Sequence, residues 1–501
     1  MKRKRRLEIF AFYDSEGIAA HLNHMAQKGW ALQSIGTTFW TYEAIEPENR
    51  TYGITFFPDV SAFDTKPTEA LQDFIAYCEE AGWHYVAQLS QMQIFYTTNE
   101  NPIPLETDES LRLEITHKAM KKNFLPGILA QLALCLWEIY LTAGPIFRDL
   151  SRYIADTSQF LLVALYTFLG LYALLTFLFY FRWRKKSLAA VEAGGTCLPT
   201  GKGMQLSAKA MHAVTLLFFV ALFYSMRQQG YGTVFLVVIL AYACIFGLIF
   251  MSINILRKKQ VSRNVNKGVI IALCVLLPLI FMVGSFHYIF NREEPMEGKE
   301  TYTTTLSDGT TYTTVLEADP LPLTTADLTE VPADAIYSMS CEEESSFLAK
   351  RMECSQYTPG GSPEAPELSY EILEVSYDFL IEPCIRSYQK PFLPQFAHSE
   401  SWEPISISGT DSAWQSTAAM VLAPIIWHKK AIVWCISTST GRYRKTSWKK
   451  PWKSSLSKPY DNKQIAEILS EDSGYFYFLH FYHNSFSKAI FSLLSKQTVP
   501  Q

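Results

Sequence analysis

The chain has 501 residues, of which 49% are hydrophobic and 18% are charged, and its formal net charge is −4. This length predicts roughly three domain-sized units. The charge balance lacks the basic surplus typical of nucleic-acid-binding proteins, so we expect no nucleic-acid partner. Apolar residues are concentrated over 124–290, between two polar segments. This distribution predicts an integral membrane protein embedded in the lipid bilayer.

The chain begins with a basic stretch, residues 2–6, that resembles the start of a signal peptide. The apolar run that follows contains Glu8 and stops at Asp14, so it is too short and too charged to direct export. We therefore expect a first domain, over 1–120, that stays in the cytoplasm.

Residues 1–100 repeat a pattern of strand, amphipathic helix and strand, and each helix ends at a Gly-Trp pair. In the first half, a strand over 7–12 is followed by a helix with the apolar stripe Ile18, Leu22 and Met25, which ends at Gly29 and Trp30. In the second half, a strand over 52–56 is followed by a helix with the apolar stripe Leu71, Phe74, Ile75 and Cys78, which ends at Gly82 and Trp83, and then by a strand over 92–96. A glycine at a helix C-terminus permits the left-handed conformation that ends a helix. Two such halves predict a ferredoxin-like α+β (βαββαβ) domain with a four-stranded antiparallel sheet.

Two features of this domain bear on binding. His21 and His24 share a helix face, but no Cys or carboxylate stands in a matching position, so we predict no metal site. Phe39, Trp40 and Tyr42 are expected on the open face of the sheet, where they would suit a partner protein or a small ligand. Packing of that face on the membrane or on a second copy of the chain remains an alternative.

The apolar middle predicts a transmembrane region over 121–290. A spanning helix needs about 20 mainly apolar residues, because the hydrocarbon core is about 30 Å thick. Five segments meet this condition: 124–146, 160–181, 208–226, 231–256 and 269–290.

The loops between these spans differ in cation content. The loops after the second and fourth spans are rich in Lys and Arg, whereas those after the first and third carry only Arg148, Arg152 and Arg227. Cationic loops tend to stay on the cytoplasmic side. The sequence therefore predicts a multi-pass protein of the cell membrane, with a cytoplasmic N-terminus and an extracytoplasmic C-terminus.

Few polar groups lie within the spans. Glu138, beside Trp137 and Tyr140, is interpreted as an interfacial carboxylate, and Pro278 as the cause of a kink. Transporters usually need buried polar groups along their path, so anchoring is the role that these spans favour.

The segment 291–501 predicts a mostly β extracytoplasmic domain. Residues 302–315 have the composition of a hairpin, with Asp308 and Gly309 in its turn. Four cysteines lie in this segment, Cys341, Cys354, Cys384 and Cys435, and the sequence leaves open whether they form disulfides or stay free. Cys341 and Cys354 are the nearest pair.

The sequence contains no catalytic motif, so we predict no catalytic, cofactor-binding or metal residues. His398, His428 and Asp411 lack the fixed spacing of a nucleophile site. His480 and His483 lie in an aromatic run, and we interpret them as part of a packed aromatic core. We interpret the cations of 442–458 as a solvated basic tail; the alternative is that they bind anionic wall polymers or lipid headgroups.

The Gly-Trp endings of the N-terminal repeats, together with 319–328 and 344–349, resemble the bacterial membrane protein family catalogued as domain of unknown function 2812. The resemblance implies this same order of N-terminal domain, spans and extracytoplasmic tail, and it implies no activity. It is lost from about residue 412, where the composition changes and a shift of reading frame is one hypothesis.

We therefore expect a non-enzymatic sensor or regulatory protein, involved in signalling, that links an extracytoplasmic domain to a cytoplasmic domain with a protein partner. The alternatives are a membrane-anchored extracytoplasmic enzyme and an accessory subunit of a transporter or export complex. The sequence identifies no cofactor, and it leaves open whether the chain forms a homo-oligomer.

Overall fold

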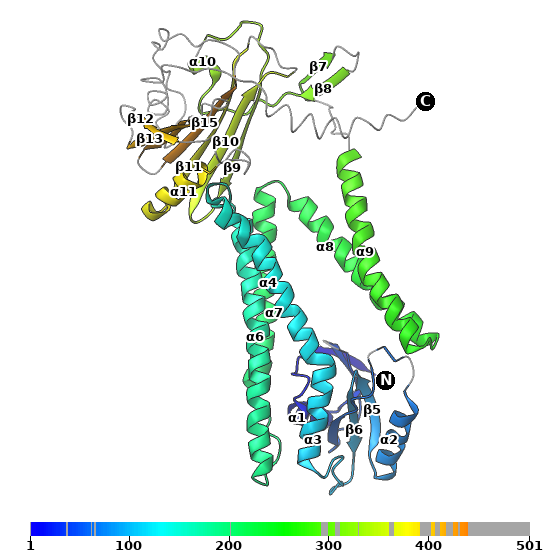
Figure 1. Ribbon diagram of the computed structural model, residues 1–501. Coiled ribbons are helices and arrows are strands. Elements are labelled where there is room, and N and C mark those ends of the chain that lie inside the picture. The colour runs from blue at the N-terminus through cyan, green and yellow to red at the C-terminus, as the bar shows by residue number, and fades with distance from the viewer. Residues whose placement is uncertain are drawn as a thin grey trace. The chain divides into compact units, whose positions relative to one another are not determined.

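The computed structural model divides into two compact units (Figure 1). It describes residues 2–36, 39–61, 63–64, 67–200, 202–291, 299–305, 311–328, 330–359, 365–390, 402–405, 411–416, 424–428 and 431–438. One unit contains the residues up to 142 and those from 160 to 291. The other contains 143–159 together with the described residues from 299 onward. The loop between the first two predicted spans thus belongs to the same unit as the C-terminal strands.

The N-terminal domain consists of two βαββ repeats. The elements are β1 (Arg3–Leu7), α1 (Ser15–Gln27), β2 (Trp30–Ser34), β3 (Phe39–Ala44), β4 (Thr51–Phe56), α2 (Glu69–Glu80), β5 (His84–Leu89) and β6 (Met92–Thr97). They form two separate three-stranded antiparallel sheets, ordered β1-β3-β2 and β4-β6-β5. The predicted repetition is present, with one strand more in each half than expected.

The single four-stranded sheet of a ferredoxin-like fold is not confirmed. The sequence pattern omitted β3 and β5, and it placed the first strand at 7–12 instead of Arg3–Leu7. β1 is rich in cations because it lies at the edge of its sheet, where charged side chains reach solvent and discourage further strand pairing.

Local signals in the sequence account for the helix boundaries. The carboxylate of Asp14 accepts a hydrogen bond from the backbone N–H of Gly17 at 3.1 Å, and Thr68 caps α2 in a similar way. Gly29 and Gly82 have φ values of +80° and +88°, so both helices end in the left-handed conformation that was expected.

The main core of this domain surrounds α1. Its buried residues come from α1, from both sheets and from α3, and include Ile18, Leu22, Tyr42, Ile54 and Ile94. Trp40 and Tyr42 are 3% and 0% exposed, so the expectation that they lie on an open sheet face is wrong. They face α1 because side chains on alternate positions of β3 point to opposite faces, and only Phe39 remains exposed.

Among the residues that the structure describes, five helices are long and apolar enough to cross a membrane, as the sequence predicted. An N-terminal extension, α3 (Glu109–Ala119), runs through a π-helical turn (Met120–Phe124) into the first of them. The five are α4 (Leu125–Arg148), α6 (Thr157–Glu192), α7 (Lys202–Gln228), α8 (Gly232–Lys258) and α9 (Arg263–Asn291). Pro278 lies inside α9, and Trp137 contacts Tyr140 on α4 with ring centroids 6.1 Å apart.

The C-terminal domain is built on a seven-stranded antiparallel sheet, ordered β12-β13-β14-β15-β11-β10-β9. Its strands are β9 (Ser338–Ser345), β10 (Ala349–Tyr357), β11 (Glu367–Val375), β12 (Trp402–Ile405), β13 (Ser412–Ser416), β14 (Pro424–His428) and β15 (Ala431–Thr438). A hairpin of β7 (Thr301–Thr305) and β8 (Thr311–Val315) precedes it, and the short helices are α5 (Leu150–Tyr153), α10 (Thr325–Leu328) and α11 (Ile381–Tyr388). The sheet continues beyond residue 412, where the family resemblance was lost.

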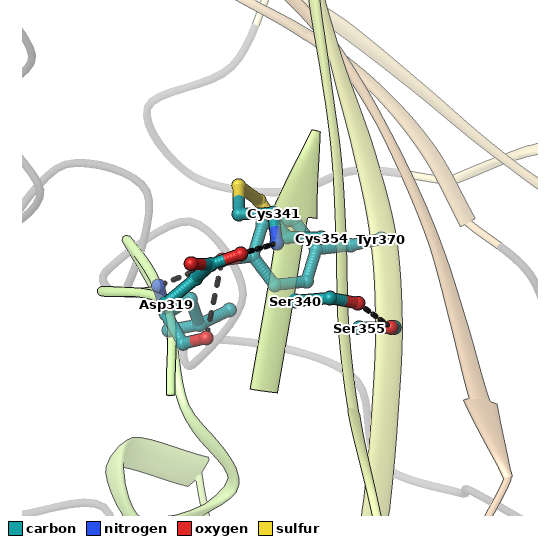
Figure 2. Close-up of a disulfide and its surroundings, with 7 residues drawn as sticks. Asp319, Ser340, Cys341, Cys354, Ser355 and Tyr370 are labelled. Carbon is teal, nitrogen blue, oxygen red and sulfur yellow. Dashed lines mark hydrogen bonds between the residues drawn. A yellow bond between two sulfur atoms is a disulfide. The ribbon is translucent and has the colours of Figure 1, made fainter. Parts of the chain in front are cut away.

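Cys341 and Cys354 form a disulfide across the paired strands β9 and β10 (Figure 2). The carboxylate of Asp319 accepts a hydrogen bond from the Cys341 backbone N–H at 3.1 Å, while Ser340 and Ser355 pair at 2.9 Å. Cys384 is a buried free thiol of α11, and burial raises its pKa to about 12. The side chains of Cys435 and His428 lie outside the described residues, as do Asp308, Gly309, His398, His480, His483 and 442–458.

Candidate functional site: the anchored ends of a helix pair

The helices α4 and α6 approach each other at Cys135 and Gly170. A Cβ atom added at Gly170 of α6 would lie 3.3 Å from the Cβ of Cys135 of α4. Cys135 and Leu165 are 5% and 4% exposed, whereas much of the remaining helix surface is exposed. At each end, this helix pair is joined to a folded domain.

At the N-terminal domain, an aromatic cluster holds the two helices. Tyr13, from the segment before α1, is 2% exposed and packs with Met120, Leu125 and Tyr180. Its ring centroid lies 5.1 Å from that of Tyr180 and 4.7 Å from that of Trp183. Burial raises the pKa of Tyr13 well above its ordinary value, so its hydroxyl stays neutral.

Hydrogen bonds reinforce this cluster. Nδ1 of His117, on α3, lies 2.7 Å from the Tyr180 hydroxyl, and the two rings are stacked. After α6, the Cys197 backbone N–H donates to the Glu109 carboxylate at 3.0 Å, and Trp183 donates from Nε1 to the Leu198 carbonyl oxygen at 2.7 Å. The end of α6 is therefore joined to α3 as well as to Tyr13.

A cleft of about 500 Å³ lies beside these contacts. It is lined by Glu16, Gly17, Ala20, Glu109, Arg112, Thr196, Cys197 and Pro199. The Arg112 guanidinium contacts Glu16, Glu106 and Glu109, so the cation is already neutralised by carboxylates of its own domain. This arrangement stabilises the junction, and the described residues that line the cleft offer no free cation to an anionic ligand.

The fifth span is also attached to the N-terminal domain. Arg263, at the start of α9, forms an ion pair with Asp64, and the side-chain amide of Asn266 donates to the Phe63 carbonyl oxygen at 2.7 Å. Burial acts to raise the pKa of Asp64, but hydrogen bonds from Arg263 and from the Ser61 backbone outweigh it and hold this pKa below its ordinary value. The carboxylate is thus charged at neutral pH.

At their other ends, α4 and α6 are joined by the loop 143–159, which is built into the C-terminal domain. Ile154 is 0% exposed and packs with Leu373, Val375 and Ile385 in the core of that domain. The Ser346 hydroxyl donates to the Ile154 carbonyl oxygen at 2.6 Å. This loop therefore contributes apolar core and not only surface.

Polar contacts fix the same loop in place. The Ser151 backbone N–H donates to Oγ of Ser387, on α11, at 3.1 Å, and the Thr157 hydroxyl donates to the Ser345 carbonyl oxygen at 2.6 Å. Lys390 donates to the Arg148 carbonyl oxygen at 2.9 Å. Nothing in the sequence of the loop indicated these partners, although Leu150, Tyr153 and Ile154 are an apolar group unusual in a short surface loop.

A buried ionic network joins β10, β11 and α11 in the same domain. Arg351 is 9% exposed and contacts Glu371, Glu353 and Glu344 at 2.7, 2.6 and 3.4 Å. The Tyr388 hydroxyl donates to Glu371, and burial together with that carboxylate raises the pKa of Tyr388 well above its ordinary value. This network orients α11, the helix that holds Ser151.

His21 and His24, which share a face of α1, have different surroundings. Nε2 of His21 lies 3.2 Å from Glu8 and 3.3 Å from the Tyr42 hydroxyl, in a polar cluster at the edge of the core. His24, three residues further along α1, is exposed. Within the described ranges, no group of three or more His, Cys, Asp or Glu residues could hold a metal ion.

Comparison with known proteins concerns the N-terminal domain. Residues 14–127 match the model of the family described as "Protein of unknown function (DUF2812)". The N-terminal domain belongs to this family. The DUF2812 match begins at Asp14, the N-cap of α1, and ends in the first turn of α4. It therefore includes both Gly-Trp endings and the π-helical turn. Comparison with curated proteins and with solved structures found no match.

Proposed function

We propose that the protein is a membrane-anchored sensor or regulatory protein, which relays the state of its C-terminal domain to its N-terminal DUF2812 domain through α4 and α6. The observation that carries this proposal is the incorporation of loop 143–159 into the C-terminal core, with Ile154 fully buried. A simple anchor needs only apolar spans, whereas this helix pair has both ends attached to folded domains.

The proposal includes an orientation, with the N-terminal domain in the cytoplasm. The excess of Lys and Arg in the loops after the second and fourth spans supports it. The disulfide between Cys341 and Cys354 supports the same orientation, because disulfides persist outside the reducing cytoplasm.

A relay of this kind requires that a change at one end of the helix pair alters the other end. The structure offers a two-part route, since Ser151 and Ile154 are held by α11 and β11, and Tyr180 is held by Tyr13 and His117. A ligand or a mechanical change that shifts α11 would act on the loop that joins α4 to α6. Rotation or sliding of the two helices would then change the packing around Tyr13.

Hydrogen exchange of the full-length protein in lipid nanodiscs, read by mass spectrometry, tests the relay. The variant Ser387→Ala removes the acceptor of the Ser151 backbone N–H without creating a large cavity. We expect faster exchange in 148–158 and also in the segments around Tyr13 and 119–125. The matched control Ser340→Ala removes a hydrogen bond to Ser355 in the same sheet, away from the loop.

The control should change exchange only within β9 and β10. If Ser387→Ala altered exchange within the C-terminal domain and its loop alone, the helix pair would be an anchor and the relay would be rejected. Equal changes in the N-terminal domain for both variants would also reject it, because they would report general destabilisation.

A further inference from the structure

Three exposed aromatic side chains lie at one end of the C-terminal sheet. Phe347 is 67% exposed, Tyr377 is 48% exposed and Phe379 is 71% exposed. Phe347 belongs to the turn between β9 and β10, which is closed by a hydrogen bond from the Ser346 backbone N–H to the Ala349 carbonyl oxygen at 2.8 Å. Single exposed apolar side chains are common on protein surfaces, whereas a group of them marks a contact with a membrane or with another protein.

Strand pairing brings these three residues to the same place. The Ser376 backbone N–H donates to the Leu348 carbonyl oxygen at 2.8 Å, so Phe347 and Tyr377, the next residues outward, lie at the ends of the adjacent strands β10 and β11. The ring of Phe379 is stacked on that of Tyr377, with the centroids 5.7 Å apart. We call Phe347, Tyr377 and Phe379 the aromatic tip.

The aromatic tip lies beside the point where the chain enters the membrane. The Thr157 hydroxyl donates to the Ser345 carbonyl oxygen, two residues before Phe347. Thr157 is the first residue of α6, and the apolar stretch of this helix begins at Phe160. Three residues of α-helix rise about 4.5 Å, and the headgroup layer on each side of a bilayer is about 5–7 Å thick. If α6 enters the hydrocarbon at Phe160, the turn that carries Phe347 is therefore at the level of the lipid headgroups.

We propose that the aromatic tip inserts into the headgroup layer of the membrane that α4 and α6 span. Aromatic side chains are enriched at this depth, because their rings bury apolar surface there and a tyrosine hydroxyl can stay in contact with water. The C-terminal domain then rests on the bilayer at this end of its sheet. The inference depends on the membrane spans and is independent of the proposed relay.

The bilayer fits this surface better than a separate protein does. The loop 143–159 is part of the C-terminal core and continues directly into α6, so the aromatic tip is held next to the lipid by the chain itself. This connection gives the contact a high effective concentration, whereas a separate partner would first have to associate.

The opposite end of β10 provides a matched control. Tyr357 is the last residue of this strand and is 37% exposed. Because β10 has nine residues and each rises about 3.3 Å, Tyr357 lies about 26 Å from the end of the strand that carries the aromatic tip. Insertion of the tip should therefore leave Tyr357 in water.

Spin labelling of the full-length protein in phosphatidylcholine nanodiscs tests the proposal. The keto amino acid p-acetylphenylalanine replaces one residue at a time, at position 347, 377, 379 or 357, and carries a nitroxide, so the free cysteines stay unmodified. Electron paramagnetic resonance measures how often the label collides with oxygen, which concentrates in lipid, and with a nickel chelate, which stays in water. We expect the ratio of oxygen to nickel collisions to be severalfold higher at 347, 377 and 379 than at 357.

A second comparison separates insertion from mere closeness to the membrane. With the label at 377, the variant F347S/F379S should lower the ratio severalfold, because two of the three inserted rings are lost. The control Y357S should leave the ratio at 377 unchanged. All three replaced side chains are exposed, so the substitutions create no cavity in the core.

Equal ratios at the aromatic tip and at 357 would overturn the proposal. So would a ratio at 377 that F347S/F379S does not change, because α4 and α6 alone would then hold the tip near the lipid. Infrequent collisions with both oxygen and nickel at the tip would also overturn it, since they would show that protein, such as a second copy of the chain, covers this surface.

Discussion

Ser346 donates a hydrogen bond from its hydroxyl to the carbonyl oxygen of Ile154 at 2.6 Å, although the two residues are 192 positions apart in the chain. Ser346 also accepts hydrogen bonds from the backbone N–H groups of Leu348 and Ala349, so it fixes the turn between β9 and β10 as well as the loop. The turn of the sheet and the loop between two spans are thus ordered by one side chain.

The burial of Ile154 predicts a large effect on the C-terminal domain. Ile154→Ala should lower the free energy of unfolding of that domain by about 2–5 kcal/mol, the range for a deleted buried Ile side chain. Pulse proteolysis of the intact protein, with cleavage followed within 330–390, measures it. The control Ile336→Ala, at a side chain that is 47% exposed, should change the value by less than about 0.5 kcal/mol. Equal effects would mean that the loop is not part of the core.

The disulfide predicts a redox-dependent stability. Cys341 and Cys354 are 13 positions apart, and closing a loop of this size stabilises a domain by roughly 3 kcal/mol in the chain-entropy description. C341S/C354S should therefore lower the free energy of unfolding by about that amount, measured by the same proteolysis. Reductant should lower the stability of the wild-type protein and leave the double variant unaffected. A loss on reduction in both proteins would assign the effect to another cysteine.

The sequence predicted those parts of the fold that depend on local rules. The five spans follow from apolar length alone, and the helix ends at Gly29 and Gly82 follow from the backbone freedom of glycine. The strands β3 and β5 were missed. β5 carries a register shift against β6, between Tyr85 and Ala87, which weakens strict alternation. β3 alternates between buried and less buried positions, but the sequence pattern did not identify it as a strand of its own.

The candidate site was out of reach of sequence reasoning for a different reason. The roles of Ser151 and Ile154 are set by partners in Ser387 and Leu373, more than 200 residues away along the chain, and no short spacing encodes them. Trp40 and Tyr42 were assigned to an exposed face because the pattern did not show where α1 packs. In both cases, tertiary contact decided the environment of a residue type that local rules leave open.

The setting of His21 predicts a pH dependence of the N-terminal domain. Burial lowers the pKa of His21 below 6.5, Arg6 and His24 act in the same direction, and Glu8 opposes them. The unfolded chain therefore binds the proton more readily, so stability is lost as the pH falls below about 6.5. His21→Gln should reduce the loss of thermal stability between pH 7 and pH 5, whereas His84→Gln, at an exposed position of β5, should keep the wild-type slope. Identical slopes in all three proteins would show that His21 does not contribute.

The buried hydroxyls of Tyr13 and Tyr370 predict opposite effects on stability when each tyrosine is replaced by phenylalanine. Tyr13 is 2% exposed, and its hydroxyl has no hydrogen-bond partner in the part of the chain that the structure describes. Removing a buried hydroxyl that lacks a partner removes a desolvation cost of about 1–3 kcal/mol, so Tyr13→Phe should preserve or raise the stability of the N-terminal domain. Tyr370 is 3% exposed, but its hydroxyl bonds to the backbone N–H and carbonyl of Leu323 at 2.9 and 3.1 Å.

Tyr370→Phe should therefore destabilise the C-terminal domain by about 1–3 kcal/mol, because two backbone groups of Leu323 lose their partner. Hydrogen exchange of the intact protein reports both variants, through the slowest amides of each domain. If Tyr13→Phe destabilised its domain as much as Tyr370→Phe does, the Tyr13 hydroxyl would have to bind a partner at the junction with α6. That result would make the hydroxyl itself, and not only the aromatic ring, part of the contact that holds the helix pair to the DUF2812 domain.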